Sequence, residues 1–220
     1  MPVQEKKQRI GLFGGTFDPV HEGHVALARH VKKKISLDRI LFIPAADPPH
    51  KQATAASFKH RVAMLECALA DISDHVGISL LEAERSAPSY TVDTLLELRR
   101  RQGGQTYYFI LGADSLLELH LWYRYQELPD LTNLVVVARP GIGFQEITAA
   151  IGRLPGPFTP DESQQFWRRT DGAELIYLPE PAMNVSSTSV RRQLASDRFP
   201  EELDRRVRNY IIDHQLYKKR

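Results

Sequence analysis

Short apolar runs alternate with amphipathic stretches along most of the chain. Six of the runs are rich in aliphatic and aromatic residues and are bounded by glycine, proline or polar residues, as strands are. Several are continuously apolar rather than alternating, which is typical of a parallel sheet covered on both faces. The pattern predicts strands at 9–15, 39–46, 75–81, 106–114, 132–141 and 173–181.

Between these runs, apolar residues recur at the spacing of an amphipathic helix. The spacing predicts helices within 24–35, 57–72, 91–104 and 200–220. Thr91 is a candidate N-cap for the third of them. Strands and helices that alternate in this way predict an α/β fold. We expect a single Rossmann-like, doubly wound, mostly parallel sheet with helices on both faces and a C-terminal helical segment.

The length of the chain, 220 residues, suits one domain that buries a sizeable core. We therefore expect residues 1–220 to form a single domain, with an α/β core at 9–184 and the helical segment at 185–220. The stretch 141–170 is rich in glycine and proline and then polar. We expect it to be a surface excursion that carries one or two short helices.

Composition narrows the classes of protein. Hydrophobic residues make up 42% and charged residues 25%, as in ordinary globular domains. The formal net charge of +2 is too small for a surface that coats nucleic acid, and no basic or aromatic stripe is evident, so no nucleic-acid partner is expected. The single cysteine, Cys67, excludes an internal disulfide and a multi-cysteine zinc site, and its helical apolar surroundings favour a core or near-core position.

The amino terminus does not resemble a targeting segment. It carries charge without an apolar stretch long enough for a signal peptide, and no window approaches the roughly 20 apolar residues of a membrane span. We therefore expect a cytoplasmic protein without a membrane partner. The sequence leaves the oligomeric state open, and a homo-oligomer is compatible with it.

The segment “IGLFGGTFDPVHEGH” concentrates the first candidate chemistry. Gly14 and Gly15 end the first predicted strand, and their lack of a Cβ lets a ligand approach the backbone closely. His21 and His24 stand at the start of the next helix, where free amides and the helix dipole favour an anion. Two other interpretations compete: a zinc site, which lacks a nearby third ligand other than His30, and ordinary turn and capping residues. The placement after a glycine-ended strand favours a phosphate site.

A second segment, “NVSSTSVRRQL”, offers hydroxyl groups at the start of a predicted helix. Ser187 and Thr188 lie there, and Arg191 follows one turn later on the same side. Alone, the segment is equally well explained as a capped helix with surface arginines. Together with the histidine segment, it predicts a second group of phosphate donors.

The segment “GGTFDPVHEGH” resembles the H-x-G-H signature of the nucleotidyltransferase superfamily and closely matches that of its nicotinate-nucleotide adenylyltransferases. Further stretches resemble motifs of that family in the same order: “PPHK”, “SYTVDTL”, “ILGAD”, “LWYRYQEL”, “VVVARPG” and “VSSTSVR”. The resemblance implies adenylyl transfer from ATP to nicotinate mononucleotide, which gives nicotinate adenine dinucleotide and pyrophosphate in NAD biosynthesis. Because the substrate phosphate is itself the nucleophile, catalysis would rest on positioning and on charge-stabilising donors.

The resemblance also implies a role for particular residues. The catalytic residues are expected to be His21, His24 and Arg191. The expected ATP-binding residues are Gly14, Gly15, Thr16, Phe17, Gly23, Asp114, Ser187 and Thr188, and the expected mononucleotide-binding residues are Lys51, Thr91, Trp122 and Tyr123. Mg²⁺ would enter with ATP and keep much of its water shell, so no carboxylate cage and no metal-ligating residue is expected.

Several of these positions also have a plainer explanation. Trp122 follows a predicted strand end, where it could stack on the pyridine ring or pack in a core or interface. Thr91 could donate to the nicotinate carboxylate or simply cap its helix, and Lys51 could meet phosphate or stay solvated. Asp114, at the carboxyl end of a predicted strand, could accept a hydrogen bond from a ribose hydroxyl. We expect Asp18 to fix its turn by bonding local amides.

Two alternative functions are kept. A pantetheine-phosphate adenylyltransferase has the same chemistry and fold and resembles “TFDP”, but that family usually has threonine where His21 stands and lacks “SYTVDTL”. A non-catalytic nucleotide-binding regulator on the same fold would not need every phosphate donor, yet His21, His24 and Arg191 are all present. The preference for the acid or the amide mononucleotide depends on backbone donors that the sequence does not place.

Overall fold

The computed structural model describes residues 7–47, 54–85, 88–180, 185–196 and 198–218. Within these residues, eight strands form one sheet in the order β3-β2-β1-β4-β5-β8-β7-β6. The strands are β1 (Arg9–Gly15), β2 (Arg39–Pro44), β3 (Val76–Ile78), β4 (Thr106–Gly112), β5 (Asn133–Val137), β6 (Thr159–Pro160), β7 (Phe166–Arg168) and β8 (Glu174–Leu178). The parallel part of the sheet consists of β3, β2, β1, β4, β5 and β8. Strand β7 pairs antiparallel with both β8 and β6.

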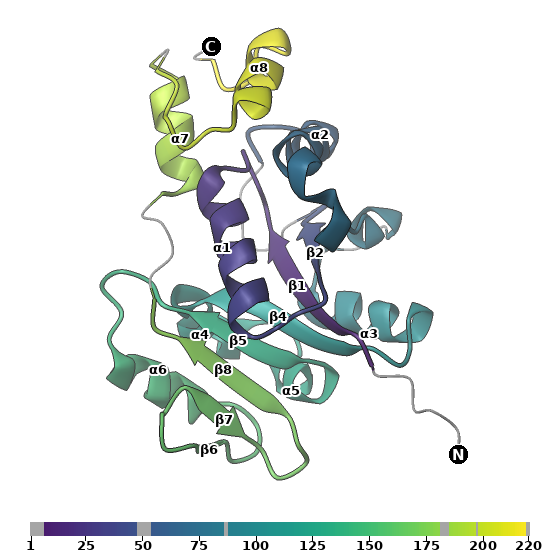
Figure 1. Cartoon of the computed structure of the whole chain (residues 1–220), viewed down its shortest axis with the longest axis vertical. Helices are drawn as coiled ribbons and strands as arrows, with labels where there is room; N and C mark the ends of the chain where they lie inside the picture. The colour runs from purple at the N-terminus through teal and green to yellow at the C-terminus, as the bar shows by residue number, and fades with distance from the viewer. Residues whose placement is uncertain (1–6, 48–53, 86–87, 181–184, 197, 219–220) are drawn as a thin grey trace.

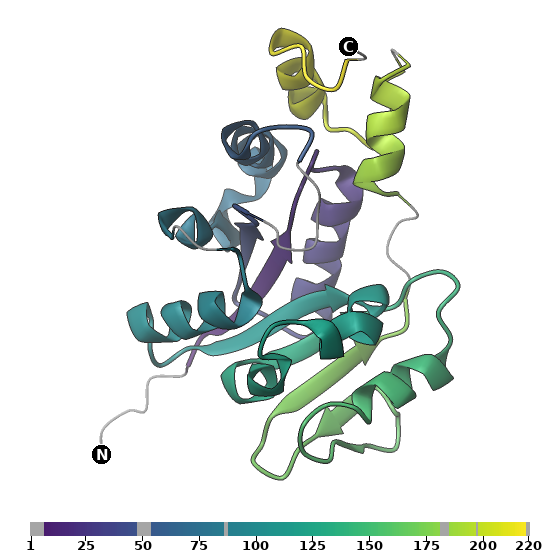
Figure 2. The same ribbon diagram turned by 180° about the vertical axis from the view of Figure 1, so that it is seen from behind.

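Helices cover both faces of the sheet. The helices are α1 (Glu22–Lys34), α2 (Phe58–Leu69), α3 (Thr91–Arg101), α4 (Ala113–Glu118), α5 (Leu128–Leu131), α6 (Phe144–Ile151), α7 (Ser187–Leu194) and α8 (Arg205–Asp213). Figure 1 shows α1 and α2 in front of the sheet, and Figure 2 shows α3, α4 and α5 on the opposite face. No helix in the described ranges is long and apolar enough to cross a membrane.

The two faces of the sheet bury separate hydrophobic clusters. On β1, Phe13 contributes to the cluster beneath α1 and α2, and its neighbour Leu12 contributes to the cluster beneath α3 and α4. The same division separates Tyr108 from Phe109 on β4. Successive strand residues point to opposite faces, so a strand buried on both sides is apolar at every position. Burial of the strands on both faces therefore explains the continuous apolar runs in the sequence. The predicted doubly wound α/β fold is confirmed.

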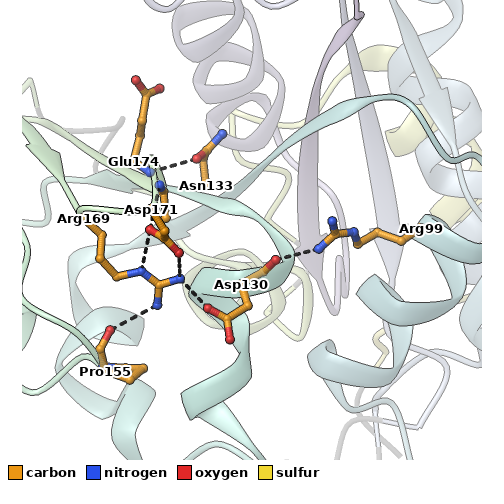
Figure 3. Close-up of polar contacts among 8 residues, drawn as sticks. Arg99, Asp130, Asn133, Pro155, Arg169, Asp171 and Glu174 are labelled. Carbon is orange, nitrogen blue, oxygen red and sulfur yellow. Dashed lines mark hydrogen bonds and ion pairs between the residues drawn. The ribbon is translucent and has the colours of Figure 1, made fainter.

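The stretch 141–170 differs from its prediction. It contains one short helix, α6, as expected, but it also supplies β6 and β7, which extend the sheet beyond β8. The turn between β7 and β8 is held by Arg169, whose guanidinium pairs with Asp130 and Asp171 and also donates to the carbonyl of Pro155 (3.3 Å). Figure 3 shows this group of contacts near the amino ends of β5 and β8. The strands were missed because β6 and β7 contain only two and three residues.

The strand order changes direction between β1 and β4. From β1 the chain proceeds outward to β2 and β3, and it then returns to β4 and proceeds outward on the other side to β5. In doubly wound sheets, ligands bind outside the carboxyl ends of the strands at such a switch point. Both α7 and α8 lie at the end of the molecule toward which β1 points (Figure 1). The fold therefore brings the two segments with candidate chemistry to one edge of the sheet.

Candidate active site

The loop between β1 and α1 stands at the switch point. Gly23, in the first turn of α1, lies so close to the segment before α7 that a Cβ at this position would be 2.5 Å from Cγ1 of Val185. Real Cβ atoms do not approach carbon this closely, so a larger residue would separate the two segments. The glycine of the H-x-G-H motif is thus explained by packing between α1 and the chain that enters α7.

The two histidines of the motif form a stacked pair at the start of α1. His21 is the N-cap residue, and its backbone N–H donates to Nδ1 of His24 (3.2 Å). Their ring centroids are 3.8 Å apart with an angle of 27° between the planes. Burial, followed by the nearby charge of Arg139, lowers the pKa of His21 to about 4, so this ring is neutral at pH 7. Its Nδ1 is buried without a hydrogen-bond partner among the described residues.

Helix α7 packs its first turn against the β1–α1 loop. Ser186 is the N-cap residue, and its hydroxyl accepts from the amide of Ser189 (3.1 Å). The hydroxyl of Ser187 donates to the carbonyl of Pro19 (3.0 Å). Nη1 of Arg191 donates to the carbonyl of Asp18 (2.6 Å), and its Nη2 donates to the hydroxyl of Thr188 (3.3 Å). The segment is therefore a capped helix that also brings hydroxyl and guanidinium groups to the loop.

A cleft of about 650 Å³ lies between the histidine pair and the start of α7. Its lining includes His21, His24 and Ser187, together with Asp114 and Arg139. Nε of Arg139 is 3.4 Å from Oδ1 of Asp114, whose side chain is 62% exposed. Imidazole, hydroxyl and guanidinium donors thus surround one space, which is the chemistry that a polyphosphate requires. We call this space the histidine cleft.

A second cavity of about 270 Å³ lies beside the carboxyl ends of β1 and β4. We call it the aromatic cavity, because Tyr90, Phe109, Trp122 and Tyr123 contribute to its wall. The rings of Phe109 and Trp122 meet edge to face with centroids 6.2 Å apart, and those of Tyr90 and Tyr123 lie 4.5 Å apart. Thr91 also lines this cavity. A flat aromatic ligand has stacking surfaces here, as well as the amides at the start of α3.

Some of the residues expected at the site line one of these two spaces, and others line neither. Gly14, Gly15 and Thr16, expected on the ATP side, line the aromatic cavity. Thr188 and Arg191 are not part of the lining of the histidine cleft, although Arg191 contacts its loop. The side chain of Phe17 lines neither space. It is 2% exposed and packs against Phe13, Phe42 and His24. Lys51 lies outside the described residues.

Three local expectations need correction. Trp122 and Tyr123 do not follow a strand end, because α4 and a 3₁₀ turn intervene after β4. Thr91 is the first residue of α3 rather than its cap, which is Tyr90. Within the described part of the chain, the carboxylate of Asp18 accepts from no amide of its own turn. It accepts instead from the amides of Ala55 (2.7 Å) and Ala56 (3.1 Å), which belong to another segment.

Buried polar residues that sequence reasoning missed support the aromatic cavity. Glu82 lines it and is 7% exposed, and its Oε1 accepts from the hydroxyl of Thr94 (2.9 Å). Burial raises the pKa of Glu82, and hydrogen bonds from Ser89 and Thr94 oppose that rise. Ser89 Oγ also accepts from the amides of Ala46 (3.1 Å) and Asp47 (3.0 Å). The cavity wall is thus fixed by contacts between the loop after β2 and the start of α3.

Arg61 is a second missed residue. It lies on α2, is 1% exposed, and donates to the carbonyls of Thr16 (2.7 Å) and Ala45 (2.8 Å). Burial lowers its pKa, and the charge of Asp18 acts in the opposite direction. The available signal was its position one turn before Leu65, on the side of the helix that carries the buried residues Met64, Leu65 and Leu69. Arg139 could also have been found, because it lies near the carboxyl end of the predicted strand of residues 132–141 and just after the observed β5.

The described residues provide no ready-made metal centre. No three His, Cys, Asp or Glu side chains within them gather closely enough to hold an ion. The stacked histidines hydrogen-bond backbone to ring instead of converging on one point. This donor set suits an anion better than a cation, and a Mg²⁺ that arrives on phosphate oxygens needs no protein carboxylate cage.

Comparison with known proteins gives consistent names. A family model described as cytidylyltransferase-like matches residues 12–193. A probable nicotinate-nucleotide adenylyltransferase of Syntrophotalea carbinolica is 39% identical over 96% of this chain and 97% of its own length. The protein of the same name from Gloeobacter violaceus is 39% identical, over 96% of both chains.

Solved structures with the same fold are more distant in sequence. The nicotinic acid mononucleotide adenylyltransferase of Plasmodium falciparum, complexed with NaAD, superposes with a TM-score of 0.74 at 19% identity. The match covers 96% of this chain and 97% of that one. The same Plasmodium falciparum protein complexed with APC gives a TM-score of 0.72 at 18% identity. These likenesses show that the chain shares that fold over 96% of its length.

Proposed function

The chain belongs to the nicotinate-nucleotide adenylyltransferases of the cytidylyltransferase-like family, and we propose that it transfers the adenylyl group of ATP to nicotinate mononucleotide. A phosphate oxygen of the mononucleotide attacks the α-phosphorus of ATP. The bond from the α-phosphorus to the oxygen that bridges to the β-phosphorus breaks, and pyrophosphate leaves with that electron pair. The products are nicotinate adenine dinucleotide and pyrophosphate, as in NAD biosynthesis.

The observation that carries this proposal is the convergence of two segments on one loop. The stacked pair His21 and His24 begins α1, and Ser187 and Arg191 on α7 bond to the carbonyls of Pro19 and Asp18 between β1 and α1. We call these two groups together the phosphate clamp. In a partly enclosed site, such donors stabilise the charge that develops on the α-phosphate and on the leaving pyrophosphate.

Each group of the clamp has a proposed role. His21 is neutral at pH 7, so its ring donates a hydrogen bond without adding a charge. His24 donates to the α-phosphate, while Arg191, Ser187 and Thr188 bind the leaving phosphates. Positioning of the two substrates supplies the rest, because the enzyme needs no nucleophile of its own.

The aromatic cavity suits the second substrate. We propose that Trp122 and Tyr123 bind the pyridine ring and that Thr91, with the first amides of α3, binds the nicotinate carboxylate. Gly14, Gly15 and Thr16 lie on the wall that this cavity shares with the end of β1. Asp114, in the lining of the histidine cleft, is proposed to accept from the ribose of ATP.

Residues 1–220 act as one domain, in which segment 185–220 supplies half of the clamp. ATP enters as its magnesium complex, with water and phosphate as the ligands of the ion. The enzyme works in the cytoplasm.

Pyrophosphate release tests the reaction. The purified protein is incubated with magnesium-ATP and, in separate arms, nicotinate mononucleotide, nicotinamide mononucleotide or phosphopantetheine. We expect turnover to be fastest with nicotinate mononucleotide. Turnover with phosphopantetheine alone would identify a pantetheine-phosphate adenylyltransferase. Binding of ATP without turnover in any arm would indicate a nucleotide-binding regulator.

A further inference from the structure

The carboxylate of Asp18 connects three segments that are distant in sequence. Asp18 is 4% exposed and accepts from the amides of Ala55 and Ala56, which precede α2. The third donor is the hydroxyl of Tyr217, which lies 2.7 Å from Oδ1 of Asp18. The backbone carbonyl of the same aspartate accepts from Arg191. One residue of the β1–α1 loop is thus bound from the segment before α2, from α7 and from the C-terminal tail.

Tyr217 is held firmly in this position. Its ring packs against the hydrophobic cluster beneath α1 and α2, and its φ of 63° lies in the left-handed region, which is unfavourable for a tyrosine. Contacts of the side chain must therefore compensate for the backbone conformation. Burial, and then the charge of Asp18, raises the pKa of Tyr217, so the phenol stays protonated and donates.

The position of Arg191 depends on the same aspartate. Its Nη1 lies 2.6 Å from the Asp18 carbonyl, and its other hydrogen bond within the described residues, to Thr188, lies on its own helix. The Asp18 carbonyl is therefore the contact that fixes where the guanidinium stands relative to the β1–α1 loop. Movement of Asp18 would shift this carbonyl and, with it, the geometry of the clamp.

We propose that Tyr217 is a positioning residue for the ATP phosphates, acting through Asp18 on Arg191. The proposal rests on the function proposed above. The C-terminal tail is then part of the ATP side of the site, although Tyr217 lines neither the histidine cleft nor the aromatic cavity. Loss of its hydroxyl should weaken ATP binding specifically and leave binding of the mononucleotide unchanged.

The experiment compares Tyr217→Phe with Tyr210→Phe. Tyr210 lies on α8, and its hydroxyl is 3.0 Å from Nδ1 of His60, so the control removes an equivalent group from the same segment without touching Asp18. For each protein, KM is measured for both substrates, and the Kd of a non-hydrolysable ATP analogue is measured by calorimetry. Urea unfolding reports the stability of each variant.

We expect Tyr217→Phe to raise the KM for ATP and the Kd of the analogue by about 5- to 20-fold, because one hydrogen bond to a charged group is lost. The KM for nicotinate mononucleotide should stay within about twofold, and Tyr210→Phe should leave all three constants within about twofold. Adding Tyr217→Phe to Asp18→Ala should raise the Kd no further, because Asp18→Ala already removes the acceptor of the Tyr217 hydroxyl.

Two results would overturn the inference. One is an unchanged Kd for the analogue in Tyr217→Phe. The other is an equal loss for both substrates that follows the drop in unfolding free energy, which would make Tyr217 a purely structural residue. Failure of the proposed function is a separate outcome. A wild-type protein that binds the analogue but makes no dinucleotide would refute the reaction, while the analogue still tests the role of Tyr217.

Discussion

Two arginines near opposite ends of the sheet, Arg169 and Arg191, have contrasting surroundings. At the amino ends of β5 and β8, Arg169 pairs with the carboxylates of Asp130 and Asp171, as Figure 3 shows. At the carboxyl end of β1, Arg191 and Arg61 donate to backbone carbonyls and one hydroxyl, and within the described part of the chain neither forms an ion pair with a carboxylate. The two settings use one kind of side chain for different purposes.

The difference lies in where the positive charge remains available. A guanidinium that faces two carboxylates is neutralised within the protein, and it anchors the turn that carries β7 to β8. The guanidinium of Arg191, held by a carbonyl and a hydroxyl, is oriented but keeps its charge for another anion, whereas Arg61 is 1% exposed and orients the loop only. The charge of Arg191 is therefore available to phosphate, whereas the charge of Arg169 is neutralised by its own carboxylate partners. Substitutions at the two ends should consequently affect different measurements.

Single replacements of Arg191 and of Arg169 by alanine should give the largest contrast between effects on activity and effects on stability. Arg191→Ala should lower kcat/KM by about 100- to 1000-fold, the usual effect of removing one charge-stabilising donor, with little change in unfolding free energy. Arg169→Ala should leave kcat/KM unchanged and lower the unfolding free energy by about 1–2 kcal/mol, since its partners are largely exposed. Steady-state kinetics and urea unfolding of both variants measure these effects. Equal losses of activity would remove the proposed distinction.

His24→Ala tests the other half of the clamp. We expect kcat to fall by about 100-fold, because the ring next to His21 donates where charge develops on the α-phosphate. The KM for the mononucleotide should change little, since His24 lies in the histidine cleft and not in the aromatic cavity. His120→Ala, at an exposed position, serves as the matched control. Normal turnover by the His24 variant would show that its assigned role is wrong.

The sequence could predict one of these regions far better than the other. Strands, helices and the two clamp segments were readable because each is a local pattern, and the doubly wound topology then brings His21 and Ser187 to one edge. The partners of Arg169 come from three separate segments, and no local pattern links them. The bonds of Asp18 to Ala55 and to Tyr217 were missed for the same reason, since they join residues 37 and 199 positions apart.

The acid sensitivity of folding should report the buried histidine. The pKa of His21 is lowered from 6.5 to about 4 in the folded protein. Between these pH values the imidazole binds a proton in the unfolded chain but not in the folded protein. Stability is therefore lost as the pH falls from about 6.5 to 4, by up to about 3 kcal/mol at about 1.4 kcal/mol per unit. Urea unfolding at several pH values measures the slope. His21→Asn should flatten it and His120→Asn should not.

The smallest effect on stability is expected from substitution of Asp171, which pairs with Arg169. Arg169 lowers the pKa of Asp171 to about 2, so the pair contributes stability above the ordinary pKa of 3.8 and loses it as the pH falls toward 2. Asp171→Asn should slightly lower the midpoint of thermal unfolding at pH 7, by less than Arg169→Ala, because Asp130 remains as a partner. High salt should reduce the difference from the wild type, since the carboxylate is exposed and screened. Turnover at pH 7 should be unchanged. A variant with normal stability but impaired turnover would place Asp171 in communication with the active site and contradict the division of roles between the two ends of the sheet.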